Sequence, residues 1–364
     1  MTETEGYLAL NALPRIGPVR IRRLLERFGG PAAVLAARPA DLLTVSGIGA
    51  DTAAILHAWQ DHTDPAAELA EAQSRGLTIL TETSADYPAP LRAIYDAPVV
   101  LYVWGALSEG DRHAIGVVGS RKTTHYGLQT AKKFAFQLAH AGLTVLSGLA
   151  RGIDTAAHEG ALAANGRTVA VLGSGLGQLY PPENLALAEK IASGHGAVVS
   201  EFPIHTPPDK QTFPMRNRIV AGWGRGVLVV ECAARSGALI TANLAGDYGR
   251  QIYAVPGPIT SPNSAGCHQL IRQGATLVSA GEDILEDFQT LSLTGTAAPP
   301  SKPSPQLAGV EAIVFAALGS EAAQVDSLVD STGLPPATVA TTLLKLEMLG
   351  IVRQLPGFRY CRDC

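Results

Sequence analysis

Short apolar runs that alternate with helical segments, from about residue 77 to residue 288, constrain the fold most strongly. Most of these runs are continuously apolar, which is typical of parallel strands that helices cover on both faces. The runs are Leu77–Thr81, Val99–Val103, Ala114–Val118, Thr144–Leu146, Thr168–Leu172, Ala197–Ser200, Val227–Val230, Gln251–Val255 and Thr276–Val278. The pattern predicts an α/β domain at 77–290 with an extended Rossmann-like, doubly wound sheet, in which extra strands precede the usual first one.

The segment before this domain, residues 1–76, has the spacing of several short helices. Its turns Ile16-Gly17-Pro18 and Val45–Gly49 are similar to the turn of a helix-hairpin-helix, whose backbone N–H groups can meet a DNA phosphate. Only Gly47-Ile48-Gly49 fits that pattern well, because Pro18 removes a donor. We therefore favour a compact helical module for protein contacts, of the SAM or helix-hairpin-helix kind, over a DNA-binding one.

The C-terminal part consists of a linker at 291–306, rich in Thr, Ala, Ser and Pro, and a small domain at 307–364. Three helical patterns followed by a hairpin around Pro356-Gly357 predict a winged helix. Its expected recognition helix, Pro335–Leu349, carries Lys345 as its single cation. A role in protein contacts is therefore at least as well supported as recognition of duplex DNA.

Composition excludes several classes of protein. At 364 residues the chain exceeds what one hydrophobic core usually supports. A net charge of −4 argues against coating of nucleic acid through bulk positive charge, but leaves room for a local basic groove. No apolar run reaches the roughly 18 residues of a membrane helix, and the acidic start is unlike a secretory signal. With four scattered cysteines, we expect a cytoplasmic protein without a membrane span.

Several unusual loops directly follow predicted strands, and such loops meet at the carboxyl edge of an open α/β sheet, where ligands bind. In the loop at 119–122, Gly119 allows close approach of a ligand and Arg121 offers a planar fork suited to phosphate. The turn at 147–154 offers backbone N–H groups for an anion, and the cluster at 236–241 follows another strand and opens another helix. The candidate binding residues are Gly119, Ser120, Arg121, Lys122, Ser147, Gly148, Ala150, Arg151, Gly152, Lys210, Phe213, Arg216, Asn217, Arg218, Ser236 and Gly237.

The segment FPMRNR at 213–218 has the composition of a nucleotide-binding surface. Helical spacing places Phe213, Arg216 and Asn217 on one side. The ring can then stack on a base while the cation meets a phosphate.

Three charged side chains near these loops have structural alternatives. Asp154 is expected to cap the start of its helix, because it would repel a phosphate placed there. His158 lies one turn later and is the expected partner of Asp154. Arg218 points away from the other residues of its segment, and its alternative role is to neutralise Glu201 or Glu231.

Signatures of common enzymes are missing from the sequence. There is no Walker A loop, nucleophile elbow or HExxH motif, and the glycines at 173–177 do not match the dinucleotide fingerprint. Cys361 and Cys364 form one C-x-x-C pair without the second pair that a tetrahedral site needs. We therefore expect no catalytic residue, no metal and no cofactor.

The order of motifs along the chain resembles one family. The motifs are Tyr87-Pro88, Leu91, Asp96-Ala97-Pro98, Gly105, Val117–Arg121, Ser147–Asp154, Ala157-His158, Tyr180-Pro181, Ser200-Glu201, Phe213–Arg218, Val230-Glu231, Ser236–Thr241, Pro256-Gly257 and Gly266-Cys267. In this order they resemble the DNA-processing protein A family (DprA, also called Smf). The end domains look like the accessory domains of that family.

The resemblance implies a protein that binds single-stranded DNA taken up during natural transformation and protects it. It also implies assistance in loading a RecA-type recombinase past single-strand-binding protein for homologous recombination, and a homodimer formed through the Rossmann-like domain. The DNA pocket of the family is centred on its Gly-Ser/Thr-Arg loop and its FPxRNR segment. These map onto Gly119, Ser120, Arg121, Phe213, Arg216, Asn217 and Arg218.

Two other functions stay open. A nucleotide-processing Rossmann enzyme, distantly similar to phosphoribohydrolases, would use Glu231, Asp154 and Arg121 on a glycosidic bond. The Pro-Gly-Gly-x-Gly-Thr loop of that group is missing here, which argues against it. The third possibility is a scaffold whose essential contacts are all with other proteins.

Overall fold

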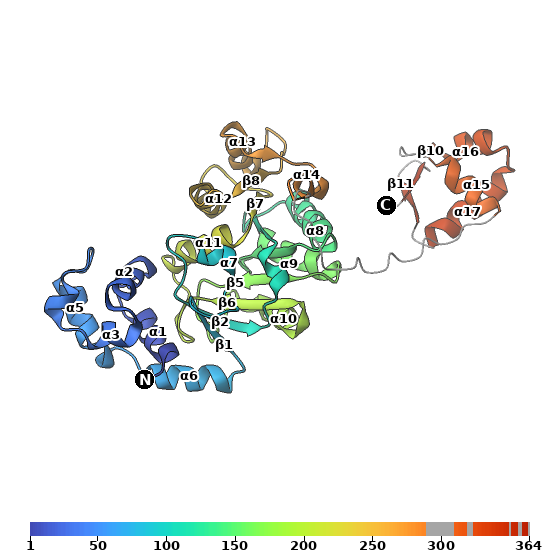
Figure 1. The fold of residues 1–364 in the computed structure, drawn as a ribbon. Helices are drawn as coiled ribbons and strands as arrows, with labels where there is room; N and C mark the ends of the chain where they lie inside the picture. Colours follow the sequence, from blue (N-terminus) through green and yellow to red (C-terminus); the bar gives the residue numbers. More distant parts are fainter. Residues whose placement is uncertain (289–308, 319–322, 349–350, 356–358, 363–364) are drawn as a thin grey trace. The chain divides into compact units, whose positions relative to one another are not determined.

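The chain forms two compact units, Met1–Thr296 and Ala297–Cys364 (Figure 1). The computed structural model describes residues 1–288, 309–318, 323–348, 351–355 and 359–362. The predicted linker at 291–306, the turn Pro356-Gly357, Leu349 and Cys364 lie outside the described residues.

A nine-stranded sheet forms the centre of the larger unit, in the order β1-β2-β6-β5-β4-β3-β7-β8-β9. The neighbouring strands β6, β5, β4, β3, β7, β8 and β9 run parallel to one another. Strands β1 and β2 add an antiparallel edge next to β6. Their bounds are β1 (Thr78–Thr81), β2 (Val100–Gly105), β3 (Ala114–Val118), β4 (Thr144–Ser147), β5 (Thr168–Val171), β6 (Gly196–Ser200), β7 (Gly226–Val229), β8 (Gln251–Ala254) and β9 (Thr276–Leu277). Each predicted run is a strand with slightly different ends, which confirms the predicted fold class.

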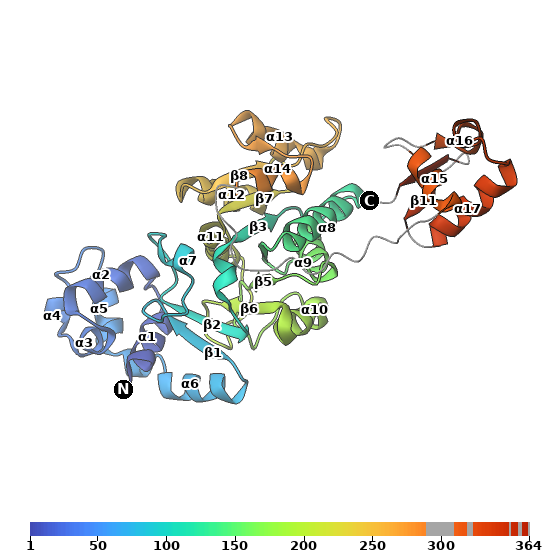
Figure 2. The same cartoon turned by 45° about the vertical axis from the view of Figure 1, so that its right-hand side comes forward.

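Helices cover both faces of this sheet (Figure 2). One layer contains α8 (His125–His140), α9 (Ile153–Ala163) and α14 (Gly281–Glu286), and the other contains α7 (Ala89–Arg92), α11 (Thr212–Trp223), α12 (Gly237–Asp247) and α13 (Ala265–Arg272). Helix α10 (Leu185–Lys190) packs near the β6 side. Along β3, Ile115 and Val117 join the core under α8 and α9, while Ala114 and Val118 join the core under α11 and α12. The continuous apolar strands therefore reflect burial on both faces.

The direction of winding reverses at β3. From β3 the chain proceeds through β4 and β5 to β6 on one side, and then crosses by α11 to β7, which pairs with β3 on its other side. The loops that follow β3 and β7 consequently diverge over opposite faces, which leaves a crevice at the carboxyl edge.

The N-terminal helices pack on the antiparallel edge of the sheet. They are α1 (Glu3–Ala12), α2 (Pro18–Phe28), α3 (Pro31–Ala36), α4 (Pro39–Leu42), α5 (Ala50–His57) and α6 (Pro65–Ser74). Their core includes Val100 and Tyr102 of β2, and the Arg22 guanidinium lies 2.8 Å from the Glu82 carboxylate. The helices thus share one core with the sheet edge, and a separate domain boundary near residue 76 stays a prediction.

The smaller unit has the winged-helix order. It contains α15 (Val310–Ala317), β10 (Ala323–Gln324), α16 (Val325–Thr332), α17 (Pro336–Met348), β11 (Val352–Leu355) and β12 (Arg359–Arg362), with a sheet ordered β10-β12-β11. Val339, Leu343 and Leu346 of α17 are buried in its core. Lys345 forms an ion pair with Glu311, so the expected cation of the recognition helix is already engaged. Among the described helices of both units, none is long and apolar enough to cross a membrane.

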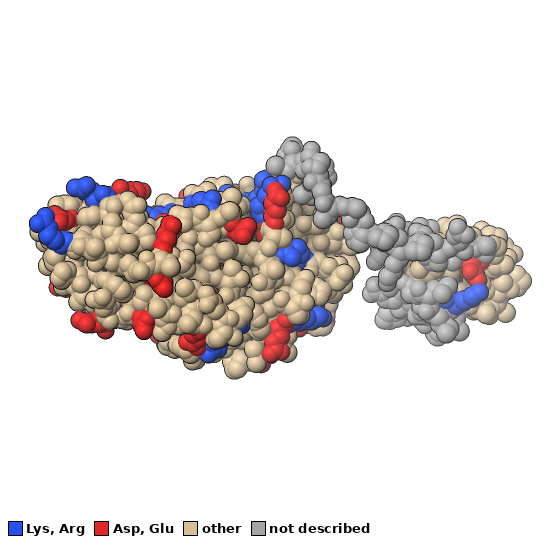
Figure 3. Space-filling model, turned by 60° about the horizontal axis from the view of Figure 1, so that its bottom comes forward, with Lys and Arg blue, Asp and Glu red and all other residues tan. Residues whose placement is uncertain are grey.

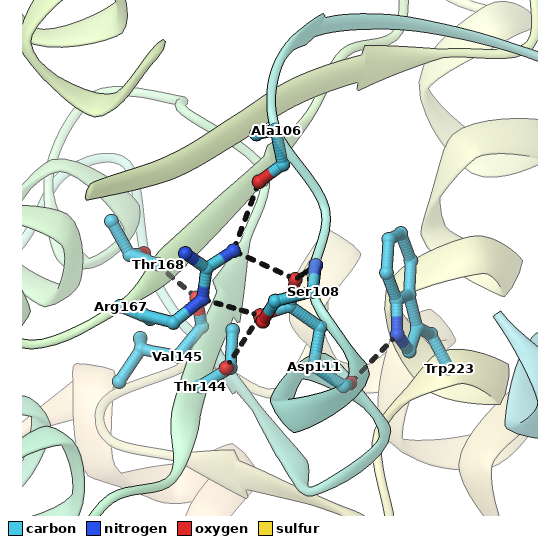
Figure 4. A network of polar contacts seen from close by, with 8 residues as sticks. All are labelled: Ala106, Ser108, Asp111, Thr144, Val145, Arg167, Thr168 and Trp223. Carbon is cyan, nitrogen blue, oxygen red and sulfur yellow. Dashed lines mark hydrogen bonds and ion pairs between the residues drawn. The ribbon is translucent and has the colours of Figure 1, made fainter. Parts of the chain in front are cut away.

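A polar network at the amino ends of β3 and β4 holds the sheet opposite the crevice (Figure 4). The buried Asp111 carboxylate accepts hydrogen bonds from Thr144 Oγ1 at 2.8 Å and from the backbone N–H of Ser108 at 2.7 Å. The Arg167 guanidinium donates to both carboxylate oxygens, each at 2.9 Å. Trp223 Nε1 donates to the Asp111 carbonyl at 3.0 Å. The Asp111 carboxylate therefore joins the starts of β4 and β5 to the start of β3, and the Asp111 carbonyl adds the end of α11.

We expect Asp111→Ala to lower the free energy of unfolding by about 2–4 kcal/mol, since the buried Thr144 hydroxyl and the half-buried Arg167 guanidinium both lose their acceptor. Urea unfolding followed by tryptophan fluorescence measures this, because Trp59, Trp104 and Trp223 all lie in the larger unit. Glu109→Ala is the control, since Glu109 is 83% exposed in its pair with Arg112. Equal stabilities of the two variants would contradict the importance of this network.

Candidate functional site

A groove with a volume of about 560 Å³ lies at the crevice beyond β3 and β7. The loops after both strands line it, together with the start of α11 and the start of α12. The lining residues are Val118, Gly119, Ser120, Arg121, Lys122, Ala150, Asp154, Lys210, Phe213, Pro214, Arg216, Asn217, Ala233, Arg235, Ser236, Gly237, Ala238, Ile240, Thr241 and Asn263.

Most of the predicted binding residues meet in this groove. Those that line it are Gly119, Ser120, Arg121, Lys122, Ala150, Lys210, Phe213, Arg216, Asn217, Ser236 and Gly237. Those that do not line it are Ser147, Gly148, Arg151, Gly152 and Arg218. Segments far apart in the chain therefore converge at one edge of the sheet, as the sequence predicts.

The loop after β3 is held by backbone contacts to its neighbours. The Ser120 N–H donates to the Glu231 carbonyl at 2.7 Å, and the Ile153 N–H donates to the Ser120 carbonyl at 3.2 Å. A Cβ on Gly119 would lie 2.5 Å from Ile153 Cγ1. Gly152 has a φ of +81°, and a side chain there would meet the Ser120 carbonyl. These glycines allow the loop to pack closely on α9, and the close approach of a ligand to Gly119, which also lines the groove, stays a prediction.

The Glu231 carboxylate fixes the start of α8 beside the groove. It accepts hydrogen bonds from Thr123 Oγ1 at 2.5 Å, from the Thr124 N–H at 2.9 Å and from Thr124 Oγ1 at 2.9 Å. Glu231 is buried and does not line the groove. The alternative enzyme thus loses one of its three expected functional groups to a structural role.

Four cations on the groove wall are exposed and lack an acidic partner. Arg121, Lys122, Lys210 and Arg235 have no carboxylate within 4.0 Å among the described residues. Elsewhere, as on the face in Figure 3, acidic and basic side chains are interspersed. The groove is therefore a local basic surface on a chain whose net charge is −4.

An aromatic ring stands among these cations. The Arg121 guanidinium carbon lies 4.8 Å from the centre of the Phe213 ring, within the range of a cation–π contact. Phe213 is half-buried, and Asn217 follows it on the same side of α11. The FPMRNR segment thus brings an aromatic ring and an amide into the groove, and stacking of the ring on a base stays a prediction.

Arg216 lines the floor of the groove, where its guanidinium is almost fully buried. It is 4% exposed, and its Nη1 donates to the carbonyls of Gly148, at 2.6 Å, and Val171. Burial lowers the pKa of Arg216 to about 10, while Asp154 opposes that change. Arg216 is therefore still cationic at neutral pH, and it contributes positive potential to the floor rather than the direct phosphate contact we expected.

Asp154 does not cap its own helix. Its carboxylate accepts hydrogen bonds from the N–H groups of Gly148, at 3.2 Å, and Ala150, at 3.4 Å, so it shapes the loop that precedes α9. Burial raises the pKa of Asp154, and the nearby Arg216 opposes that rise. The expected N-cap is wrong because Gly152 occupies that position.

His158 is not the partner of Asp154. Its Nδ1 lies 2.7 Å from Thr168 Oγ1, and that hydroxyl donates to the Val145 carbonyl at 2.7 Å. Since the hydroxyl has one proton, His158 Nδ1 must carry the hydrogen and donate, which leaves the unpartnered Nε2 without one. The side chain faces the sheet because α9 buries that side, which helical spacing alone did not reveal.

Arg218 takes the alternative role predicted for it. It is buried, its Nη2 pairs with the Glu201 carboxylate, and its Nη1 donates to the Asp96 carbonyl at 2.6 Å. Ser147 is also internal and donates to the Val117 carbonyl at 2.6 Å. Arg151 is exposed but pairs with Glu183 beside the groove.

Sequence reasoning missed two polar residues of the groove wall, Arg235 and Asn263. Arg235 directly precedes the Ser236-Gly237 turn, so its place before a helix start was a usable signal. Asn263 comes from a short helical turn before α13 and donates to the Lys122 carbonyl at 3.0 Å. Only the fold brings it to the loop after β3.

Together, the three parts define a class: a Rossmann-like protein with a basic groove at its topological switch point, preceded in the sequence by helix-hairpin-helix-type helices and followed in the sequence by a winged helix. Residues 78–289 match the DNA recombination-mediator protein A family, residues 298–357 the DprA winged helix domain, and residues 7–57 the SAM-like helix-hairpin-helix tandem. The chain belongs to the DNA recombination-mediator protein A family.

Relatives support this assignment over most of the chain. Protein Smf of Synechocystis is 34% identical over 99% of both chains, and Protein Smf of Escherichia coli is 44% identical over 74% of both. The crystal structure of DNA processing protein A from Streptococcus pneumoniae matches with a TM-score of 0.69 and 37% identity, over 79% of this chain and 99% of that one. DNA processing protein A from Helicobacter pylori, solved to describe its single-stranded DNA binding mode, matches with a TM-score of 0.53 and 26% identity, over 59% and 96%.

The buried His158 predicts a specific dependence of stability on pH. Burial, and secondarily Arg216, lowers the pKa of His158 to about 3 from its ordinary value of 6.5. Below pH 6.5 the unfolded chain therefore binds a proton at this histidine that the folded chain does not bind. The folded state consequently loses stability relative to the unfolded state as the pH falls from 6.5 toward 3. We expect wild type to lose stability relative to His158→Leu over that range, measured by urea unfolding at each pH. Parallel profiles would show that His158 is not held neutral.

Proposed function

We propose that this chain binds single-stranded DNA in the groove and takes no part in bond-making or bond-breaking, with no metal or cofactor. The observation that carries the proposal is a groove lined by Phe213 and by four exposed cations that have no acidic partner among the residues the structure describes. Cations bind the phosphates of any nucleic acid, whereas a ring can stack only on a base whose face is free. The combination favours a single strand over a duplex.

The biological role we propose follows the family and its relatives. The DNA bound would be that taken up during natural transformation, which the protein protects and hands to a RecA-type recombinase, past single-strand-binding protein, for homologous recombination. The protein would act in the cytoplasm as a homodimer. Support comes from the family's description as a recombination mediator and from the DNA-processing relative of Streptococcus pneumoniae, 45% identical over 56% of this chain.

Within the groove, the direct DNA contacts would be Arg121, Lys122, Lys210, Phe213 and Asn217, with Arg235 added from the structure. The backbone around Ser120, Ser236 and Gly237 would contribute N–H and hydroxyl groups. Arg216 would act through its charge from the floor of the groove. Arg218 would act only by holding α11 against Glu201.

We expect Arg121→Ala to weaken binding of oligo-dT about 10- to 100-fold with unchanged thermal stability, because this exposed guanidinium forms no ion pair with any residue that the structure describes. Fluorescence anisotropy and a thermal melt measure the two effects. Arg272→Ala, an exposed arginine on α13 outside the groove, is the matched control. If Arg121→Ala and wild type bound oligo-dT with equal affinity, the groove proposal would be wrong and a scaffold that contacts other proteins would be favoured.

We also expect a steep salt dependence. The logarithm of the oligo-dT affinity should fall linearly with that of the salt concentration, with a slope of about −0.7 per neutralised phosphate. Lys210→Ala should reduce the magnitude of that slope by about this amount. A duplex of equal length should bind more weakly at every salt concentration, and stronger duplex binding would refute the groove assignment.

A further inference from the structure

We propose that Tyr180 is a second base-stacking surface, in a slot next to the groove that takes one base of the same strand. This inference rests on the proposed function of the groove. Two aromatic rings and two guanidinium groups form a continuous cluster there. The Arg121 guanidinium lies over Phe213 at 4.8 Å, the Phe213 and Tyr180 ring centres are 5.9 Å apart, and the Arg151 guanidinium lies over Tyr180 at 5.9 Å.

A small cavity joins this cluster to the groove. All four side chains line it, and Arg121, Ala150, Phe213 and Arg216 also line the groove. A strand that follows the groove past Phe213 therefore reaches Tyr180 without crossing a wall of other residues.

The cavity is closed in the free protein. Its volume is about 20 Å³, which has room for about one water molecule and not for a base. Entry of a base thus requires one of the guanidinium groups to leave its ring. Arg121 can do so because it is exposed and, within the described part of the chain, has no carboxylate partner. Arg151, which is 55% exposed, can do so by exchanging its ion pair with Glu183.

The exchange is favourable when a nucleic-acid strand is present. Arg151 is held by an ion pair with Glu183, which is 47% exposed, and pairs of this kind contribute little. A base stacks on an aromatic ring more strongly than an exposed guanidinium does. The guanidinium that leaves the ring gains a charge-assisted bond to a phosphate. Each arginine therefore covers a ring in the free protein and contacts the backbone of the bound strand.

An experiment with two ligands distinguishes base stacking by Tyr180 from phosphate binding. The first is oligo-dT, and the second is an abasic deoxyribose-phosphate chain of the same length. We expect Tyr180→Leu to weaken binding of oligo-dT about tenfold, as for the loss of one stacked base, and to bind the abasic chain as wild type does. Tyr180→Phe keeps the ring and should bind oligo-dT normally.

A second variant reads the stack directly. Tyr180→Trp should retain affinity, and its fluorescence should be quenched by oligo-dT but not by the abasic chain. Tyr95→Leu, which alters a tyrosine that is 66% exposed outside the groove, is the matched control. A thermal melt checks that each variant is folded.

Two results would overturn the inference. One is unchanged oligo-dT affinity in Tyr180→Leu, and the other is an equal loss for both ligands, which would indicate a structural or electrostatic effect. Failure of the groove proposal is distinct, because wild type would then bind neither ligand and Arg121→Ala would change nothing.

Discussion

The pairing of β3 with both β4 and β7 is the constraint on which the groove depends. In the chain, β4 follows one helix after β3, but β7 lies more than a hundred residues away. Their parallel registers, Ile115 with Val145 and Ile115 with Gly226, align the carboxyl ends of all three strands. Without that alignment the loops after them would have no common edge. The double burial of β3 enforces it, since each face of the strand has its own helical layer.

Two acidic residues then set the shape of the groove without facing its ligand as free anions. Glu231 binds the start of α8 through Thr123 and Thr124, and Asp154 binds the backbone of the loop before α9. Both are buried, so their hydrogen bonds must replace those of water. Asp154, the acid nearest the groove, is balanced by the charge of Arg216. The exposed charged side chains of the groove wall are the cations Arg121, Lys122, Lys210 and Arg235. This division explains how an acidic chain presents a basic site.

The arginines at and beside the groove are likewise of two kinds, buried ones that bond to the protein and exposed ones that lie on aromatic rings. Arg216 and Arg218 are separated only by Asn217 in the FPMRNR segment, and each is buried and bonded to the protein itself. Arg121 and Arg151 come from loops, are exposed, and lie on aromatic rings. A guanidinium on a ring is ready to exchange that contact for a phosphate, whereas one bonded to carbonyls of the sheet edge is part of the fold. Composition of a segment does not distinguish the two.

The sequence by itself determined the strands, the layers and the segments that meet at the site, because apolar runs and glycine turns act locally and parallel strands share an edge. Motif order also identified the family. Tertiary structure alone decided which polar groups are free: His158 turned to Thr168, Arg216 was buried in the floor of the groove, and Asn263 entered its wall. The physical reason is that hydrogen-bond partners across the sheet depend on the rotation of each helix about its own axis against the sheet. No local sequence pattern specifies that rotation.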